Sequence, residues 1–424
     1  MQLPETLAGW LGLLEARHGQ SIQLGLDRVR AVRDALNLPQ TCPLFLVGGT
    51  NGKGSTCALL EAVLLAAGKR VGLYTSPHLL RYNERVRVDG REVGDAALVA
   101  AFAEVERARG AIPLTYFEHG TLAAWVAFAR AGLDAVILEV GLGGRLDAVN
   151  VFEPDCSIVT SVAMDHMDYL GDTREAIGFE KAGIFRPGKP AICGDPLPPA
   201  SLVAHAEAIG AQLQVSGRDF GFAGDPNQWA FWTAGGSRRG GLAYPALRGT
   251  NQLLNAAAVM AACEAVKDIL PVPMQAIRQG FMLVDLPGRF QVMPGRPAVV
   301  LDVAHNPQAA GVLNENLASM GFFPETWAVF GMLADKDVAA VVRLLRDRVD
   351  HWLVATLPGP RGLSAEKLAA ILRDVGVAGD VSECVSPASA YEVAVGRAAE
   401  SDRIVVFGSF LTVAEVMAAR KASQ

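Results

Sequence analysis

The sequence predicts an α/β protein with two open sheets, of which the first is mostly parallel and the second is smaller. Short apolar runs alternate with amphipathic helical stretches along the chain, as they do in βαβ units. A glycine-rich stretch, GGTNGKGST (48–56), lies between a predicted strand and a predicted helix. The proline- and glycine-rich stretch LPGRFQVMPGRP (286–297) interrupts the alternation, which then restarts.

The elements of the first domain follow from the period of their apolar residues. Buried strands are expected at 43–49, 70–76, 134–141 and 156–163. Helices are expected from the glycine-rich stretch to about 67, and at 95–109, 119–132, 173–185 and 251–267. Residues 217–248 are glycine-rich and aromatic with short alternating pieces, which predicts a small antiparallel β insertion.

The second domain repeats the alternation on a smaller scale. Strands are expected at 298–304, 326–332, 351–357 and 403–409, each followed by a helix. We therefore expect a first domain at 1–290, a linker at 291–297 and a second domain at 298–424. Ligands of such open sheets bind beyond the carboxyl ends of the strands, so functional residues are expected there.

Composition excludes several classes of protein. The 424 residues carry a net charge of −6 and show no run of Lys or Arg, which argues against a nucleic-acid partner. The six cysteines are scattered without a C-x-x-C pair, which favours reduced thiols in the cytoplasm. No apolar run is long enough to span a bilayer, and the first residues lack the basic stretch of a signal peptide.

The stretch 48–56 predicts a P-loop, although it departs from the pattern G-x-x-x-x-G-K-[ST]. Val47 replaces the first glycine, and Gly54 follows Lys53 where the hydroxyl residue is usual. Its glycines let backbone N–H groups surround an anion, and Lys53 can reach the outer phosphates of a nucleotide. The alternative is a glycine-rich turn with a capping serine.

The metal that accompanies a nucleotide needs ligands from elsewhere in the chain. Ser55 is displaced by one residue, or about 100° around a helix axis, from the usual position of the hydroxyl. Ser76, Glu139 and His166 each lie at or just beyond a predicted strand end. Ser76 could instead form a turn, and His166 could be structural, because imidazole is not a preferred ligand of Mg²⁺. Glu139 in an apolar strand needs a partner in either case.

Eight motifs in order resemble the folylpolyglutamate synthases, and more closely the bacterial bifunctional enzymes that are also dihydrofolate synthases, relatives of the Mur ligases. They are GTNGKGS (49–55), TSPHL (75–79), EVGLGGRLDAVN (139–150), DHMDYLG (165–171), EKAGIFRPG (180–188), NQLLNAAAV (251–259), PGRF (287–290) and DVAHNP (302–307). The resemblance covers nearly the whole chain and is weakest at 200–245. It implies a P-loop-containing ATP-binding domain and a Rossmann-like glutamate ligase domain, with ATP and Mg²⁺ between them.

The resemblance also implies roles for individual residues. The expected magnesium ligands are Ser76, Glu139 and His166. The expected nucleotide contacts are Thr50, Asn51, Gly52, Lys53, Gly54, Ser55, Asn255, Arg289 and Asp302. The expected dihydropteroate contacts are Thr115, Tyr116, Phe117, Glu118, Leu146, Asp147 and Ala148.

Lys181 matches a lysine that is carbamylated in the family, where the added carboxylate holds a second magnesium. The alternative is an ordinary helix lysine paired with Glu180 or Glu175. His305, with Asn306, matches a motif placed near the incoming glutamate and the γ-phosphate. Lys53, Lys181 and His305 are the residues expected to take part in catalysis.

The activity implied is ATP-dependent ligation of L-glutamate to dihydropteroate and to folates, through an acyl phosphate, by a monomeric enzyme. The nearest alternative is a Mur-type amino-acid ligase acting on a UDP-muramyl peptide. That class carries a UDP-binding domain before the P-loop, and here the loop begins near residue 48, which leaves no room for one. A P-loop switch or motor is a second alternative, but it requires the strict order of lysine and hydroxyl residue.

Overall fold

The structure is a computed structural model that describes residues 3–17, 23–225, 227–249 and 251–422. These residues form two compact units. The first comprises the described parts of 1–163, 167–246 and 253–284, and the second those of 164–166, 247–252 and 285–424. Within the described residues, no helix combines the length and the apolar composition needed to cross a membrane.

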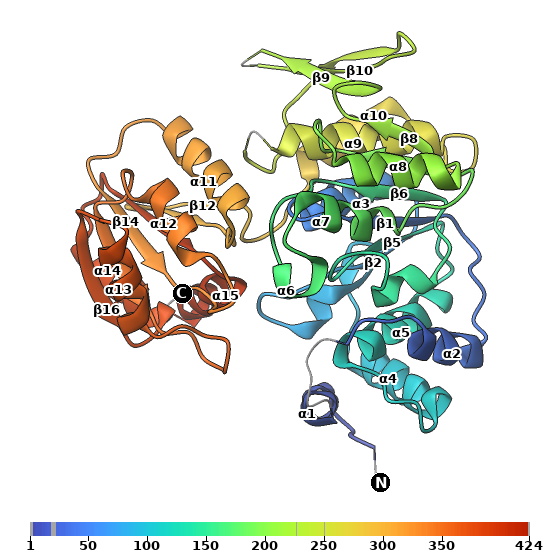
Figure 1. Ribbon diagram of the computed structural model, residues 1–424, viewed down its shortest axis with the longest axis horizontal. Coiled ribbons are helices and arrows are strands. Elements are labelled where there is room, and N and C mark those ends of the chain that lie inside the picture. The colour runs from blue at the N-terminus through green and yellow to red at the C-terminus, as the bar shows by residue number, and fades with distance from the viewer. Residues whose placement is uncertain (1–2, 18–22, 226, 250, 423–424) are drawn as a thin grey trace. The chain divides into compact units, whose positions relative to one another are not determined.

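The first unit is built on one sheet with the strand order β4-β3-β2-β5-β1-β6-β7-β8 (Figure 1). Its parallel strands are β1 (Leu44–Gly48), β2 (Val71–Tyr74), β5 (Ala135–Glu139), β6 (Cys156–Val159), β7 (Pro190–Cys193) and β8 (Gln212–Val215). The short strands β3 (Val86–Val88) and β4 (Arg91–Glu92) extend one edge antiparallel. The buried strands are almost entirely apolar, as expected for a parallel sheet that is covered on both faces.

Helices cover this sheet, and they pack in pairs: α3 against α10, α4 against α5, and α7 against α8 (Figure 1). The helices of this part of the chain are α1 (Leu7–Arg17), α2 (Asp27–Leu36), α3 (Lys53–Ala66), α4 (Asp95–Arg109), α5 (Tyr116–Ala129), α6 (Met167–Leu170), α7 (Arg174–Ala182), α8 (Ala200–Ile209), α9 (Gln252–Ala265) and α10 (Met274–Leu283). Two 3₁₀ turns, η1 (Tyr82–Arg85) and η2 (Ala148–Val151), follow β2 and β5.

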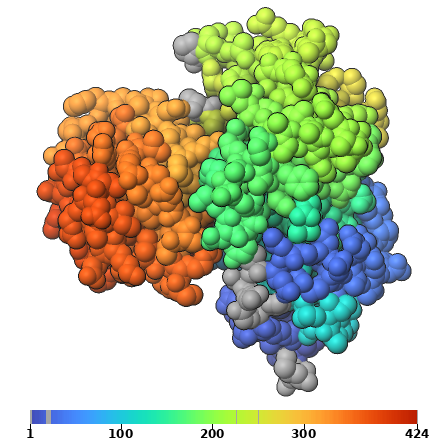
Figure 2. Space-filling view, viewed as in Figure 1, coloured from blue at the N-terminus to red at the C-terminus, as the bar shows by residue number. Residues whose placement is uncertain are grey.

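The stretch expected to form an antiparallel insertion contains a three-stranded antiparallel sheet. Its strands are β9 (Phe220–Gly224), β10 (Trp229–Thr233) and β11 (Arg238–Leu242). The indole of Trp229 is buried 6.0 Å from the ring of Phe281 on α10, which fixes the small sheet to the body of the unit. The surface of this sheet and of α8 appears yellow-green in Figure 2.

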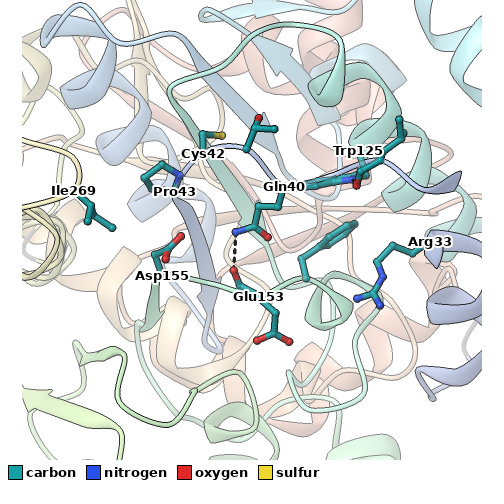
Figure 3. Close-up of a pocket in the computed structure, with 11 residues that line it drawn as sticks. Arg33, Gln40, Cys42, Pro43, Trp125, Glu153, Asp155 and Ile269 are labelled. Atoms are coloured by element: carbon teal, nitrogen blue, oxygen red, sulfur yellow. Dashed lines mark hydrogen bonds between the residues drawn. The ribbon is translucent and has the colours of Figure 1, made fainter.

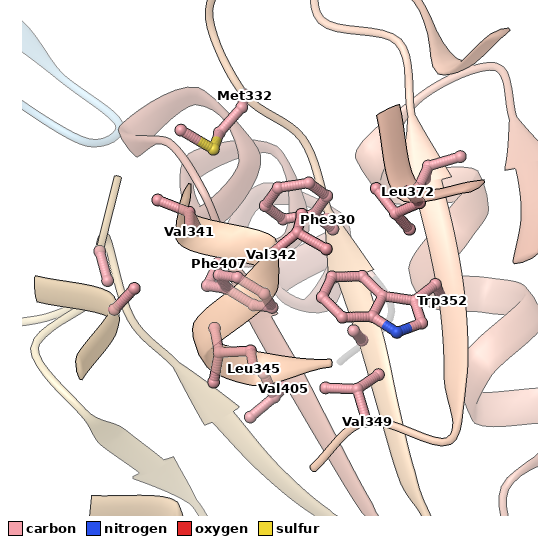
Figure 4. Packing of buried hydrophobic residues seen from close by; sticks show 14 of the residues in the cluster. Phe330, Met332, Val341, Val342, Leu345, Val349, Trp352, Leu372, Val405 and Phe407 are labelled. Carbon is pink, nitrogen blue, oxygen red and sulfur yellow. The ribbon is translucent and has the colours of Figure 1, made fainter. Parts of the chain in front are cut away.

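The second unit has a sheet of its own with the order β12-β13-β17-β14-β15-β16. Its strands are β12 (Gln291–Met293), β13 (Ala298–Leu301), β14 (Thr326–Phe330), β15 (His351–Ala355), β16 (Asp380–Cys384) and β17 (Arg403–Phe407). Its helices are α11 (Pro307–Ser319), α12 (Val338–Leu345), α13 (Ala365–Asp374), α14 (Pro387–Arg397) and α15 (Phe410–Ala422). The rings of Phe330, Trp352 and Phe407 pack in its apolar core, with centroids 4.9 to 6.1 Å apart (Figure 4).

The α/β fold with two sheets is as the sequence predicts, and the differences concern individual elements. Helix α5 begins at Tyr116 instead of 119, because Thr115 caps it. Strands β7, β8 and β16 were not expected. Part of the stretch expected to be a linker forms β12, which pairs antiparallel with β13.

Candidate active site

The carboxyl ends of four neighbouring strands meet at one edge of the first sheet. The order β2-β5-β1-β6 and the parallel register place Val47 beside Glu139 and Gly48 beside Val159. Residues that follow these strands therefore gather at that edge. They include Ser76, the P-loop and the segment Thr160–Ala163.

The P-loop joins β1 to α3 through two glycines with positive φ. Gly49 has φ 142° and Gly52 has φ 87°. A Cβ on Gly49 would lie 1.9 Å from Oγ1 of Thr160, and one on Gly52 would lie 2.6 Å from Oδ1 of Asn255. Both positions therefore require glycine, and the amide of Asn255, an expected nucleotide contact, lies against the loop.

Positive charge is concentrated at the P-loop. Nζ of Lys53 donates to the carbonyls of Gly49 and Thr50 at 3.1 and 3.2 Å, so the ammonium group lies over the loop. Helix α3 begins at Lys53, and its first N–H groups and its dipole favour an anion here. Ser55 is buried in the first turn of α3. The loop therefore has the features of a phosphate site.

Two of the expected metal ligands lie side by side at this edge. The backbone N–H of Ser76 donates to Oε2 of Glu139 at 3.1 Å, and Glu139 is only 4% exposed. A hydroxyl and a carboxylate are hard oxygen donors, which fits the preference of Mg²⁺ for a few protein oxygens and several waters. His166, the third expected ligand, belongs to the second unit and has a left-handed backbone, with φ 53°. Among the described residues, no group of three or more His, Cys, Asp or Glu side chains is arranged to hold a metal.

Lys181 is buried on α7, with 3% of its surface exposed. Of the two carboxylates considered as its partners, Glu180 accepts from Arg145 at 2.8 Å, and Glu175 accepts from the N–H of Ser201 at 2.8 Å. Burying an ammonium group is costly. A buried ammonium group therefore needs a compensating interaction.

The first expected dihydropteroate stretch starts α5 with a capping box. Oγ1 of Thr115 accepts from the N–H of Glu118 at 3.1 Å, and Oε2 of Glu118 accepts from the N–H of Thr115 at 2.7 Å. Glu118 also pairs with Arg28 of α2 at 2.9 Å. The side chains of Thr115 and Glu118 thus hold the helix start in place.

The aromatic residues of the same stretch face the strand ends. The guanidinium of Arg85 lies 5.6 Å from the centroid of the Tyr116 ring. The Phe117 ring lies 5.9 Å from that of Tyr74, and a Cβ on Gly141 would come within 2.6 Å of its Cζ. Phe117 therefore packs against β2 and against the loop that follows β5.

Asp147 organises the second expected dihydropteroate stretch. Its carboxylate accepts from the N–H groups of Leu142 at 2.8 Å and Val149 at 3.1 Å, which closes the loop after β5. Burial raises the pKa of Asp147 to about 7, although the backbone N–H groups oppose the rise. Ala148 is buried beside it, and Leu146 is half-buried.

The second unit holds the remaining expected residues. The Asp302 carboxylate accepts from the N–H groups of Phe290 at 2.9 Å and Ala304 at 2.8 Å, and burial raises its pKa. The guanidinium of Arg289 lies 4.9 Å from the centre of the Phe410 ring. Asp302 thus joins Phe290, which follows Arg289, to Ala304 within its own DVAHNP motif.

A buried ionic cluster surrounds Asp165. Lys336 donates to its Oδ1 at 2.5 Å, Asn306 donates to its Oδ2 at 3.1 Å, and Nε2 of His305 lies 3.7 Å from the same Oδ2. Burial alone would raise the pKa of Asp165, but His305 and the charges of His166 and Lys336 hold it well below its usual range. Neither Asp165 nor Lys336 was singled out from sequence. Two features of the sequence could have indicated them: Asp165 directly precedes His166, and Lys336 lies shortly after a predicted strand.

A cavity of about 610 Å³ opens at the other end of the first sheet (Figure 3). It is lined by residues that precede strands, such as Pro43 before β1 and Asp155 before β6. Gln40 and Glu153 also line it, joined by a hydrogen bond of 2.8 Å from the Gln40 amide to the Glu153 carbonyl. Because the P-loop follows β1, this cavity is distinct from the candidate site.

Two family models match separate parts of the chain. The Mur ligase middle domain model matches residues 47–193, and the Mur ligase glutamate ligase domain model matches residues 288–410. The dihydrofolate synthase/folylpolyglutamate synthase of Escherichia coli K12 is 47% identical over 417 residues, covering 98% of this chain and 96% of that protein.

Solved structures match over the same length. The structure of E. coli FolC in complex with DHPP and ADP superposes with a TM-score of 0.94 at 46% identity, covering 100% of this chain and 99% of that one. A bifunctional folylpolyglutamate synthase/dihydrofolate synthase with Mn, AMPPNP and L-glutamate bound matches with a TM-score of 0.92 at 46% identity, covering 99% and 100%.

Proposed function

Because the chain belongs to the dihydrofolate synthase/folylpolyglutamate synthases of the Mur ligase family, we propose that it joins L-glutamate to dihydropteroate and to folylpolyglutamates. It is an ATP-dependent amide ligase that uses a divalent metal ion. The observation that carries this function is the match to the E. coli enzyme along the whole chain, in sequence and in structure.

The chemistry explains the need for ATP. A carboxylate is a poor acylating agent, because oxide would have to leave. Transfer of the γ-phosphoryl group to a carboxylate oxygen gives an acyl phosphate and ADP. The amine of glutamate then attacks the acyl carbon, the amide bond forms, and phosphate leaves with the C–O bond electrons. The protein has to hold three reactants in line and to neutralise the charge of the phosphoryl oxygens.

The P-loop supplies much of that neutralisation. Lys53 and the N–H groups of Gly52 to Ser55 bind the phosphates, and the amide of Asn255 lies against Gly52. The N–H groups of Thr50 and Asn51 donate to Ser161, so these two residues shape the loop around the phosphates. Arg289 and Asp302, the other expected nucleotide contacts, belong to the second unit.

Ser76 and Glu139 would hold the metal ion, and the fit rests on the hard oxygens that meet at the ends of β2 and β5. His166, the third expected ligand, belongs to the second unit. A bound divalent ion supplies positive charge to the phosphoryl oxygens. Lys181, buried and modified to a carbamate, provides a carboxylate for a second ion.

Dihydropteroate lies against residues 115–118, at the start of α5, and residues 146–148, in the loop after β5. Tyr116 and Phe117 provide aromatic surface for a pterin ring, and Thr115 and Glu118 keep the start of α5 in place. The loop closed by Asp147, with Leu146 and Ala148, completes the contact. His305 acts on the incoming glutamate in this proposal, which the resemblance of DVAHNP supports.

The remaining features of the proposal concern the whole molecule. The first unit binds ATP, and the second unit, which includes residues 285–424 and therefore the stretch 291–297, forms the glutamate ligase domain. The enzyme acts as a monomer in the cytoplasm, in keeping with its six free cysteines.

The test is an assay of the purified protein with ATP, Mg²⁺, L-glutamate and dihydropteroate. Dihydrofolate and ADP are expected to form in equal amounts. Without an acceptor carboxylate, ADP release should be close to background, as for a ligase and unlike a switch or motor. A UDP-muramyl peptide should not replace dihydropteroate. Absence of ADP release in the complete mixture would remove the proposal.

A further inference from the structure

The segment Thr160–Ala163, which follows β6, contacts the P-loop along its length. The N–H of Thr160 donates to the carbonyl of Gly48 at 2.9 Å, and the N–H of Thr50 donates to the carbonyl of Ser161 at 2.7 Å. These backbone bonds continue the pairing of β1 and β6 past the strand ends. Side chains from both segments then add further bonds.

Thr160 supplies the first of these side chains. Its Oγ1 donates to the carbonyl of Asn51 at 2.6 Å, and the carbonyl of Gly48 lies 3.2 Å from the same atom. The hydroxyl occupies the space that a Cβ on Gly49 would need, since such an atom would lie 1.9 Å away. The Thr160 hydroxyl therefore fits against the loop only because Gly49 has no side chain.

Ser161 and Ala163 form hydrogen bonds with the next two residues of the loop, Thr50 and Asn51. Oγ of Ser161 accepts from the N–H of Asn51 and lies 3.1 Å from its carbonyl oxygen as well. Oγ1 of Thr50 lies 3.0 Å from the N–H and 3.1 Å from the carbonyl of Ala163. Both backbone polar groups of Asn51 and the side chain of Thr50 are thus held from outside the loop.

The segment is itself fixed from its other side. The N–H of Val162 donates to Oδ2 of Asp195 at 2.9 Å, and its carbonyl accepts from Nε of Arg174 at 2.9 Å. Arg174 and Asp195 also pair with each other at 3.1 Å. Both backbone polar groups of Val162 are therefore bonded to side chains outside the P-loop.

We propose that the hydroxyls of Thr160 and Ser161 are positioning residues for phosphoryl transfer, which hold the P-loop in the shape that binds ATP before ATP arrives. The proposal deepens the function proposed above and rests on it. Neither hydroxyl needs to touch the nucleotide, because both act through the backbone of Asn51. A loop that reaches its binding shape only part of the time binds with an affinity reduced by that fraction.

The expected effect follows from the strength of one hydrogen bond. Loss of one hydrogen bond, about 1 kcal/mol, changes the equilibrium constant between the competent loop and its other shapes roughly fivefold. Thr160→Ala is therefore expected to raise KM for ATP, and the Kd for ADP, by up to about fivefold. KM for dihydropteroate and for glutamate should stay within about twofold.

Two companion variants separate positioning from packing. Thr160→Ser keeps the hydroxyl and loses only the methyl group, so it differs from Thr160→Ala by the oxygen alone, and it should behave as the wild type. Ser157→Ala is the matched control, because Ser157 is a buried serine of β6 whose Oγ donates to the carbonyl of Ile184 at 2.8 Å, away from the P-loop. It should lower the thermal midpoint as Thr160→Ala does and leave KM for ATP unchanged.

The outcomes distinguish this proposal from the function on which it rests. Equal KM values for ATP in Thr160→Ala and Ser157→Ala would overturn the positioning role, as would a Thr160→Ser variant as impaired as Thr160→Ala. If Thr160→Ala does not fold, Ser161→Ala gives the same comparison with a single hydroxyl removed. If the wild type binds ADP but does not turn over dihydropteroate, the function fails, and the ADP titrations still decide the role of the hydroxyls.

Discussion

The backbone N–H of Ser76 donates to Oε2 of Glu139 at 3.1 Å, which joins the second residue after β2 to the last residue of β5. The parallel register of β2 and β5 makes this contact possible, because it brings the ends of both strands to one level. The contact orients the carboxylate of Glu139 and holds the start of the loop that carries Ser76. Both residues then present oxygens at the edge where the P-loop lies.

The first prediction concerns the charge of Glu139. Glu139→Gln keeps an oxygen that can accept from Ser76 but removes the negative charge that a divalent metal requires. Turnover is expected to fall roughly a hundredfold or more, as for loss of one electrostatic contact in an active site. ADP release with dihydropteroate, titrated with Mg²⁺, measures it. Wild-type turnover at ordinary Mg²⁺ would show that Glu139 is no metal ligand, and an unchanged thermal midpoint is the control for folding.

The second prediction concerns the modification of Lys181. A carbamate forms from a neutral amine and carbon dioxide, so enzyme prepared in carbon-dioxide-free buffer at mildly acid pH should lose activity and regain it with bicarbonate. Lys181→Ala should be nearly inactive, and a small carboxylic acid such as acetate should restore part of the rate by occupying the vacated space. Arg145→Ala, which removes the partner of Glu180 and the guanidinium over the ring of Phe179, is the control. Activity independent of bicarbonate, with no rescue, would contradict the modification.

Much of the candidate site could be predicted from sequence because it consists of residues that follow strands. The apolar runs locate β1, β2, β5 and β6, and parallel strands bring their carboxyl ends together. Glu139 stood out because a carboxylate in an apolar strand needs a partner, and the structure supplies one in Ser76.

Other relationships could not be predicted because they depend on tertiary contacts. Thr115 and Glu118 are interpreted as substrate contacts by resemblance, although T-x-x-E before an apolar run is the local signature of a capping box. Only the pair of Glu118 with Arg28 depends on a tertiary contact. The ion pair of Asp165 and Lys336 joins residues 171 positions apart, and no periodic pattern records it. Strand β12 lies in a stretch whose prolines and glycines predict a loop, and its pairing with β13 overrides that local preference.

The third prediction tests the ion pair of Asp165 and Lys336. Their side chains are 9% and 6% exposed, so removing one partner leaves a buried charge uncompensated. Asp165→Asn is expected to destabilise the protein by about 3 kcal/mol. Adding Lys336→Met should restore part of that loss. Thermal midpoints of both single variants and of the double variant measure the coupling.

The exposed pair of Arg361 and Asp335 provides the control for this cycle. These side chains are 51% and 31% exposed, and a pair of that kind contributes about 1 kcal/mol or less. Asp335→Asn should therefore shift the thermal midpoint much less than Asp165→Asn. Equal shifts for the two variants would show that the Asp165 cluster carries no special stabilisation.

The fourth prediction concerns the close approach at Gly49. Any Cβ at this position would overlap Oγ1 of Thr160, and φ 142° is unfavourable for L-residues. Gly49→Ala should distort the P-loop and abolish binding of ADP in a calorimetric titration. Gly12→Ala lies in the interior of α1 with open space around the new methyl group, so it should leave binding unchanged. Binding of ADP by Gly49→Ala with wild-type affinity would contradict the observed geometry.

The fifth prediction concerns pH and Glu61, a carboxylate buried on α3 beside Arg87, whose Nη2 lies 2.9 Å from it. Burial raises the pKa of Glu61 from 4.5 to about 7, against the opposing charge of Arg87. Between these two values the folded protein keeps a proton that the unfolded chain has released. The free energy of unfolding therefore falls as pH rises from about 4.5 to about 7, and is constant on either side as far as this group is concerned.

Glu61→Gln cannot titrate, so its stability should fall less steeply across that pH range than that of the wild type. The quantity to compare is the slope of stability against pH in the two proteins. Leaving Arg87 without its partner lowers the stability of Glu61→Gln by the same amount at every pH, so it does not change this slope. Thermal midpoints measured at half-unit steps from pH 4 to pH 8 give both slopes, and Glu207→Gln on the exposed face of α8 is the matched control. Parallel curves for the wild type and Glu61→Gln would mean that Arg87 compensates fully for the burial of Glu61, which would then be charged throughout this range.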